Sequence, residues 1–243
     1  MGDFLQHNKY LFVFAHPDEE IYTCVTIQRL ALQNKTVHVL YVTSGDYNGP
    51  KLVEIREKEA LEAVQLLGIK SENVRFLRIP EKRLMSELKD VRGQIEQIVA
   101  AFDSDCLVTH DFEGGHNGHD AVSYVATKAA RILPTYTFPA YHDWPERRKY
   151  NRFISQHPAT ETFRLDNEQK DLKRSVMNVH ASQKRFMDEI LDSDSREQFF
   201  DHEKLRKLDE PYDYTKAPTD PVGYEFPGSP IRFADFISAI ERV

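Results

Sequence analysis

The pattern of apolar and polar residues along the chain predicts strands that alternate with helices. Four short, nearly continuous apolar runs are typical of buried strands, and they lie at 10–14, 36–42, 74–77 and 105–109. Longer stretches with apolar residues at helical spacing follow them, at 20–33, 51–67, 84–101 and 120–132. Strand and helix therefore alternate four times over.

This alternation predicts an α/β fold with a Rossmann-like, mostly parallel sheet flanked by helices. Right-handed connections between parallel strands place helices on both faces of one sheet. The doubly wound order 3-2-1-4 would set the first and fourth strands side by side. Ligands bind at such a switch point, beyond the carboxyl ends of the strands. Side chains that follow these two strands are therefore expected to lie together.

The C-terminal part of the chain is less regular. Residues 135–141 suggest a strand, with His142-Asp143-Trp144 after it, and residues 167–191 read as one helix. Residues 209–230 are rich in proline and aromatic residues, so they resist regular structure. We expect a single domain over residues 1–243, with a core at about 9–190. The aromatic residues of the proline-rich segment are expected to pack it onto that core and to shape the pocket; they are Tyr212, Tyr214, Tyr224 and Phe226.

The composition is typical of a globular enzyme. With 243 residues, 40% of them hydrophobic, the chain can bury a substantial core. It has no run of about 18 apolar residues, so we expect no membrane span. Residues 1–9 lack the apolar core of a signal peptide, and Cys24 and Cys106 are too few for a disulfide framework. Both observations favour the reducing cytoplasm.

The net charge of −7 argues against a nucleic-acid partner, which needs a basic face. The densest basic segment, Glu146–Arg152, is expected to be exposed or to contact an anionic part of a substrate. The chain also lacks a glycine-rich phosphate loop, HExxH and GxSxG, which excludes several classes of enzyme. The sequence does not distinguish a monomer from a homo-oligomer.

Two clusters of imidazoles and carboxylates follow the first and fourth predicted strands. AHPDEE occupies 15–20, and HDFEGGHNGHD occupies 110–120. Imidazole and carboxylate groups are the usual non-thiolate ligands of a divalent transition metal. A site with two histidines and one carboxylate leaves a coordination position free for water. The sequence therefore predicts a metal-dependent hydrolase whose site lies at the switch point, where Ser44-Gly45-Asp46 also falls.

Each cluster also has a simpler interpretation when it is taken alone. His-Pro-Asp after a strand is commonly a turn, and the glycines of the second cluster suit a flexible loop. Their joint occurrence at two neighbouring strand ends is what favours a site. A dinucleotide-binding oxidoreductase is disfavoured, because no G-x-G-x-x-G follows the first strand.

The two clusters resemble the signatures of one enzyme family. AHPDEE is similar to the AHPDDE-type motif of the PIG-L/LmbE-like metal-dependent N-acetylglucosaminyl deacetylases, and GGHNGHD at 114–120 is similar to their second motif. Weaker matches lie at Gly45, at 56–59 with 66–68, and at 180–183. The resemblance implies a zinc-dependent hydrolase that removes the N-acetyl group from an N-acetylglucosamine-type amino sugar or a sugar-linked small molecule.

The resemblance also implies roles for individual residues. It implies one divalent metal ion, most simply Zn²⁺, held by His16, Glu19 and His119. Iron and cobalt suit the same ligands. Glu19 stands where the family usually has aspartate, and its additional methylene can displace the metal while still allowing an oxygen ligand.

The remaining roles concern the reaction. Asp18 would be the general base, removing a proton from water activated by the metal, and His116 would be the electrophilic or acid partner. Arg56 would contact the substrate, although its charged helix also suits a solvated face. Asp120, or Asp111, would orient a ligand histidine. His180 suits a buried structural role equally well.

Two other functions stay open at the level of sequence. One is an amidase that cleaves a larger acyl or peptide-like group with the same metal machinery, which the size of the pocket would distinguish. The other is a non-catalytic metal- or carbohydrate-binding protein on the same fold, for which Glu19 is the only indication. The presence of Asp18 and His116 makes that second alternative the weaker one.

Overall fold

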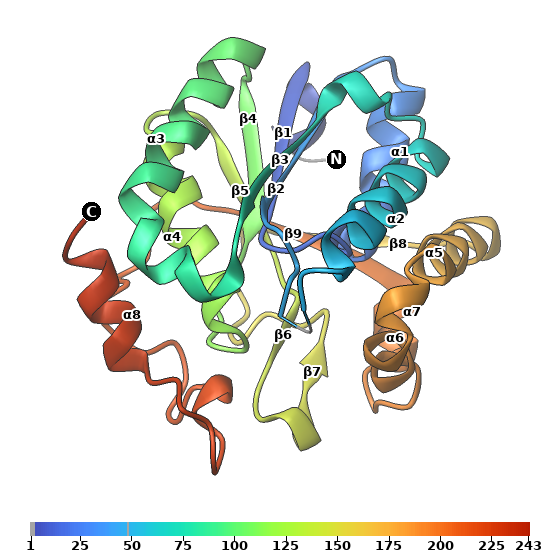
Figure 1. Ribbon diagram of the computed structural model, residues 1–243. Helices are drawn as coiled ribbons and strands as arrows, with labels where there is room; N and C mark the ends of the chain where they lie inside the picture. Colours follow the sequence, from blue (N-terminus) through green and yellow to red (C-terminus); the bar gives the residue numbers. More distant parts are fainter. Residues whose placement is uncertain (1–2, 48) are drawn as a thin grey trace.

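One mixed sheet runs through the centre of the protein (Figure 1), in a computed structural model that describes residues 3–47 and 49–243. Its strands lie in the order β3-β2-β1-β4-β5-β9-β8. Their bounds are β1 Lys9–Phe14, β2 Thr36–Thr43, β3 Val74–Ile79, β4 Cys106–His110, β5 Thr135–Phe138, β8 Thr160–Arg164 and β9 His202–Lys207. Strands β1 to β5 pair in parallel, and β9 pairs antiparallel with both β5 and β8.

Helices cover both faces of this sheet (Figure 1). One face carries α1 Cys24–Leu32, α2 Leu52–Leu66 and α5 Asn167–Val179, and the other carries α3 Leu84–Phe102, α4 Asn117–Ala130 and α8 Phe233–Ile240. Because side chains alternate along a strand, Phe12 and Phe14 pack under the first group while Leu11 and Val13 pack under the second. The predicted α/β fold and the predicted order of the first four strands are confirmed.

Three predicted elements are shortened or divided in the structure. Helix α1 begins at Cys24, because residues Glu19–Tyr22 form a separate 3-10 turn. The helix predicted at 167–191 is interrupted after Val179, and α6 resumes at Lys184–Leu191, because the backbone of His180 leaves the helical region. The strand predicted at 135–141 ends at Phe138, since Pro139 has no N–H to donate. Tyr141, the last residue of the predicted strand, instead belongs to β6, Tyr141–His142, which pairs with β7, Lys149–Tyr150.

The proline-rich segment lies against helix α4 and the loop before it. Its backbone is irregular except for a 3-10 turn at Gly223–Glu225. The hydroxyl of Tyr214 lies 3.1 Å from Ser123 Oγ and 3.0 Å from Thr127 Oγ1, both on α4. The N–H of Gly223 donates to the carbonyl of Gly114 at 2.7 Å. The proline-rich segment therefore supports helix α4, which begins within the second cluster, at 110–120.

Within residues 3–47 and 49–243, no helix has the length and apolar character needed to cross a membrane.

Candidate metal centre

Sheet topology brings the two clusters together. Strands β1 and β4 pair in parallel, with Phe12 opposite Val108, so both chains leave the sheet at the same edge. The loop after β1 carries His16, Asp18 and Glu19. The loop after β4 leads to His116, which caps the N-terminus of α4. The fold therefore brings the two clusters together at the switch point, as predicted.

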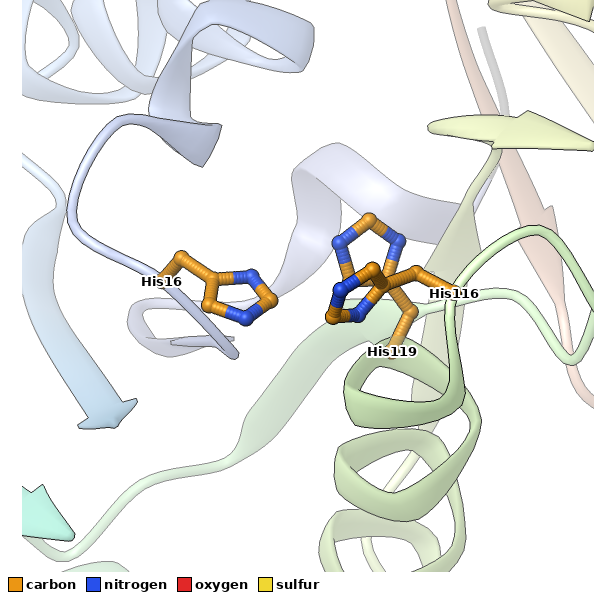
Figure 2. Close-up of side chains that lie close together, drawn as sticks. All are labelled: His16, His116 and His119. Atoms are coloured by element: carbon orange, nitrogen blue, oxygen red, sulfur yellow. The ribbon is translucent and has the colours of Figure 1, made fainter. Parts of the chain in front are cut away.

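Three imidazole rings face one another at this edge (Figure 2). The ring centroids of His16 and His116 are 4.8 Å apart, those of His16 and His119 are 5.3 Å apart, and those of His116 and His119 are 5.0 Å apart. One nitrogen from each ring lies within 4.8 Å of the others. Such a spacing allows a single ion to be reached from several rings.

Glu19 lies at the centre of this cluster. Its Oε1 is 2.6 Å from His16 Nδ1 and 2.5 Å from His119 Nε2. Its Oε2 accepts the backbone N–H of His16 at 2.8 Å and lies 2.8 Å from His110 Nε2. All four side chains are almost completely buried. The additional methylene of glutamate thus leaves the carboxylate between the two predicted histidine ligands.

The donor atoms present suit a divalent metal ion. His16, Glu19 and His119 offer two imidazole nitrogens and one carboxylate oxygen, the mixed set that zinc, iron and cobalt accept. Glu19 Oε1 lies close to the rings of both His16 and His119, so the two imidazoles and the carboxylate that would hold such an ion are already together. The residues therefore fit the predicted ion.

The surroundings set the protonation of the two histidine ligands differently. Burial opposes the charged form of His16, but the carboxylates of Glu19 and Glu81 outweigh it and raise the pKa of His16 to about 10. Burial lowers the pKa of His119 to about 3, against the attraction of Glu19. Burial would raise the pKa of Glu19, yet His110, His119 and His16 hold it well below its usual range. A metal ion must therefore displace a proton from His16 but not from His119.

Asp18 is held by Arg56. Its Oδ1 lies 3.0 Å from Arg56 Nη2, and Arg56 also donates to the carbonyls of Pro17 at 3.2 Å and Gly45 at 3.1 Å. Gly45 has a φ of +66°, and a Cβ there would lie 2.7 Å from Arg56 Nη1, so only glycine fits beside the guanidinium. These donors are directed at the protein, and the contact of Arg56 with the substrate stays a prediction.

The backbone at Asp18 is also unusual, with a φ of 156° that residues with a side chain rarely adopt. Burial raises the pKa of Asp18, and the positive charge of Arg56 opposes this only in part. A carboxylate with a raised pKa accepts a proton more readily than an exposed one.

His116 presents one ring nitrogen to the cluster. Its Nδ1 accepts the N–H of Gly118 at 3.1 Å, which caps the helix. The neutral ring therefore carries its proton on Nε2. Burial, together with the charge on His16, lowers the pKa of His116 well below its usual range, so the ring is neutral at physiological pH.

Asp120 supports the loop before His116, and its orientation of a ligand histidine stays a prediction. Its Oδ1 accepts the N–H groups of Glu113 at 3.3 Å and Gly114 at 3.0 Å. Asp111, the other candidate, accepts the hydroxyls of Thr137, at 2.8 Å, and Tyr212. Both carboxylates therefore act on the backbone or on other elements.

Two residues near the cluster were not predicted. Glu81 Oε2 lies 3.6 Å from His16 Nε2, on the side of the ring away from Glu19. It follows β3, so extending the strand-end argument to the third strand would have found it. His110 is the last residue of β4; it begins the second cluster in the sequence, but no role was predicted for it. His180 takes the structural role left open for it, because its Nε2 pairs with the buried Glu20.

A protein-family model and two curated relatives match the chain. The model described as PIG-L: GlcNAc-PI de-N-acetylase matches residues 11–130, a range that holds both clusters. The probable N-acetylglucosaminyl-phosphatidylinositol de-N-acetylase of Schizosaccharomyces pombe is 33% identical over 157 residues, which cover 61% of this chain and 62% of the relative. The N-acetylglucosaminyl-phosphatidylinositol de-N-acetylase of Bos taurus is 34% identical over 131 residues, or 51% of this chain and 49% of the relative. The chain thus spans about half to three fifths of these relatives.

Solved structures share the fold at low sequence identity. The A40926 pseudoaglycone deacetylase Dbv21 has a TM-score of 0.64 at 17% identity, covering 83% of this chain and 97% of its own. The N,N'-diacetylchitobiose deacetylase of Pyrococcus horikoshii has a TM-score of 0.61 at 19% identity, with 84% and 85% covered. GalB, a 4-carboxy-2-hydroxymuconate hydratase of Pseudomonas putida, has a TM-score of 0.62 at 16% identity, with 84% and 98% covered. Because a hydratase is among them, the fold alone does not determine the reaction.

Proposed function

This chain belongs to the PIG-L/LmbE-like family through its residues 11–130, and from that premise we propose that it is a metal-dependent hydrolase. The proposed reaction removes the N-acetyl group from an N-acetylglucosamine-type amino sugar or a sugar-linked small molecule. The observation that carries the proposal is the convergence of His16, Glu19 and His119 beside a buried Asp18. The names of the two curated relatives support the choice of an amino-sugar amide.

The proposed ligands of one divalent metal ion, Zn²⁺ in the first instance, are His16, Glu19 and His119. When bound, such an ion polarises a carbonyl oxygen and lowers the pKa of a bound water toward neutrality. The three residues hold their donors close together in a buried region, where electrostatic effects are stronger than in water. Only three protein ligands are assigned, which is the arrangement that suits a catalytic site and not a closed structural one.

Asp18 is the proposed general base. Arg56 binds Oδ1, so the second carboxylate oxygen is left to accept a proton from the attacking water. The raised pKa of Asp18 favours this transfer, and the guanidinium keeps the side chain in one orientation. Arg56 is therefore proposed to act through Asp18, in addition to the substrate contact that the family resemblance implies for it.

His116 is the proposed electrophile. Because Nδ1 is occupied by the N–H of Gly118, the neutral ring offers an Nε2–H donor toward the cluster. A donor placed in advance stabilises negative charge that develops on the amide oxygen, and the departing amine can take the proton that Asp18 has accepted from the water. The role therefore does not require a protonated imidazole.

The proposal extends to the organisation and location of the chain. We propose one domain over residues 1–243, with a core at about 9–190 on which the segment 209–230 packs. The buried contacts of Tyr214 with α4 support this arrangement. Cys24 and Cys106 are free and buried, which suits the reducing cytoplasm where we place the protein.

Acetate release from a panel of N-acetylglucosamine conjugates tests the function. We expect release that a chelator abolishes and that added Zn²⁺ restores. The matched substrates carry the same sugar with a longer acyl chain on nitrogen. Release only from the longer amides would favour the amidase alternative, and metal binding without any release would favour a binding protein.

A further inference from the structure

We propose that His110 is a positioning residue that fixes the carboxylate of Glu19 for metal binding. This inference rests on the proposed function, because it assigns His110 to the proposed metal centre. His110 ends β4, and its side chain is completely buried, with 0% exposed. It belongs to no catalytic role described above, and its Nε2 lies 2.8 Å from Glu19 Oε2.

The ring of His110 is held firmly by its neighbours. It stacks on the ring of His119, with centroids 4.3 Å apart and planes at 19°. Its other neighbours are aromatic, with the centroid of Phe138 at 4.6 Å and that of Phe14 at 6.5 Å. A buried ring with partners on several sides has little rotational freedom. Its Nε2 therefore provides a fixed point for Glu19.

The contacts of His110 bear on which of its ring nitrogens carries a proton. Its Nδ1 is buried and has no hydrogen-bond partner among the described residues, so a proton there would be an unpaired buried donor. The Ala15 N–H donates to Nε2 at 3.1 Å, and it would lose this acceptor if Nε2 carried the proton. A hydrogen bond to a charged carboxylate is the stronger of the two. Nε2 therefore carries the proton and donates it to Glu19.

This bond determines which oxygen of Glu19 faces the ligands. The His110 ring and the His16 backbone N–H both donate to Oε2, so Oε1 is left toward His16 Nδ1 and His119 Nε2. Glutamate has one more rotatable bond than aspartate, and ordering a flexible side chain costs free energy. Fixing Oε2 in advance removes this cost from metal binding. Partners of this kind typically change metal affinity 10- to 100-fold.

A direct ligand role for His110 is the competing interpretation, because Glu19, His110 and His119 also bring donor atoms within 4.8 Å of one another. Its Nε2, however, is already directed at Oε2 and at the Ala15 N–H. Four protein ligands would also give a closed, structural type of site. The two roles predict different results when Glu19 is shortened.

The test measures the Zn²⁺ dissociation constant by competition with a chelator, which needs no catalytic activity. We expect His110→Phe, which keeps the aromatic packing, to weaken Zn²⁺ binding about 10- to 100-fold. His110→Gln, whose amide can donate to Oε2, should restore most of the affinity. In the Glu19→Asp background, where the shorter carboxylate no longer spans the cluster to His110, His110→Phe should change affinity less than about threefold.

Two results would overturn the proposal. An equal loss from His110→Phe in both backgrounds would mean that the ring acts as a ligand or only as packing. An unchanged Zn²⁺ affinity in His110→Phe alone would mean that Glu19 does not need His110 to hold its orientation. Circular dichroism and thermal unfolding of the metal-free variants check that they fold, and His110→Gln provides a second variant if His110→Phe does not. Failure of the proposed function would appear separately, as wild-type protein that binds Zn²⁺ but releases no acetate.

Discussion

Arg56 Nη2 lies 3.0 Å from Asp18 Oδ1, and this ion pair joins helix α2 to the turn that follows β1. Both side chains are almost fully buried, at 7% exposure each. The same guanidinium donates to the carbonyl of Pro17, so it fixes the turn and its carboxylate together. The orientation of the proposed base therefore depends on a residue about forty positions away, across the switch point of the sheet.

Replacement of Arg56 by lysine should reduce kcat with little effect on metal content. Lysine keeps the charge but lacks the planar fork that reaches Pro17, Gly45 and Asp18 together. We expect kcat to fall about 10- to 100-fold, the usual effect of losing a supporting partner. A rise in KM at constant kcat would mean instead that Arg56 acts only through contact with the substrate. Arg78→Lys, at an exposed pair with Glu57, is the matched control and should leave both constants unchanged.

Replacement of His116 by phenylalanine, which has a ring but no donor, separates the electrophile from the ligands. Loss of an oxyanion donor typically costs about 10²- to 10³-fold in kcat, so we expect a decrease of that size. Bound Zn²⁺ should stay near the wild-type level, because His116 is not a proposed ligand. A variant that has lost its metal would show that His16, His116 and His119, whose donors also lie within 4.8 Å of one another, are the ligand set.

Metal affinity should rise with pH. Glu19 and Glu81 raise the pKa of His16 to about 10, so the metal-free ring is protonated at neutral pH and must lose this proton to bind an ion. His119, with a pKa of about 3, is already neutral and releases no proton when a metal ion binds. We expect about one proton released per Zn²⁺ between pH 7 and 9, or a tenfold gain in affinity per pH unit. Titration calorimetry in buffers of different ionisation enthalpy measures the number of protons released per bound Zn²⁺. Release of no proton would contradict the protonation assigned to His16.

The proline-rich segment should contribute to stability through Tyr214. Tyr214→Phe removes the hydroxyl that lies 3.1 Å from Ser123 Oγ and 3.0 Å from Thr127 Oγ1. The free energy of unfolding should fall by about 0.5–1.5 kcal/mol, the net effect of a lost buried hydrogen bond. Urea denaturation measures it. Tyr47→Phe, at a side chain 71% exposed, is the control, and an equal effect in both variants would argue against a specific contact.

The central part of the fold could be predicted because each element carries its own signal. The strands β1, β2 and β4 are apolar runs buried on both faces, β3 is a partly exposed edge strand, and their order follows from the alternation with helices. Strands β8 and β9 carry no such signal, since charged residues make up much of TETFR and HEKLRK. Glu203 of β9 is buried because it accepts the N–H groups of Val25 and Thr26 at the start of α1. A contact across that distance in the sequence is not visible in local patterning.

The candidate site could be predicted only in part for the same reason. His16 and His119 lie in short motifs that directly follow predicted strands, and this position indicates them as candidate ligands. The inward direction of Arg56 depends on the space that Gly45 leaves, and a helix rich in charges gives no sign of it. His110 received no predicted role because its partner, Glu19, lies 91 positions earlier in the sequence.

The most direct test of the central claim compares wild-type protein with Asp18→Asn, by elemental analysis and acetate release on the same preparations. We predict about one equivalent of zinc in both proteins and chelator-sensitive release from the wild type only, because the amide of asparagine cannot accept the proton. A fully active Asp18→Asn variant would contradict the assignment of the base. Wild-type protein that binds no metal, even after reconstitution, would contradict the metal centre itself.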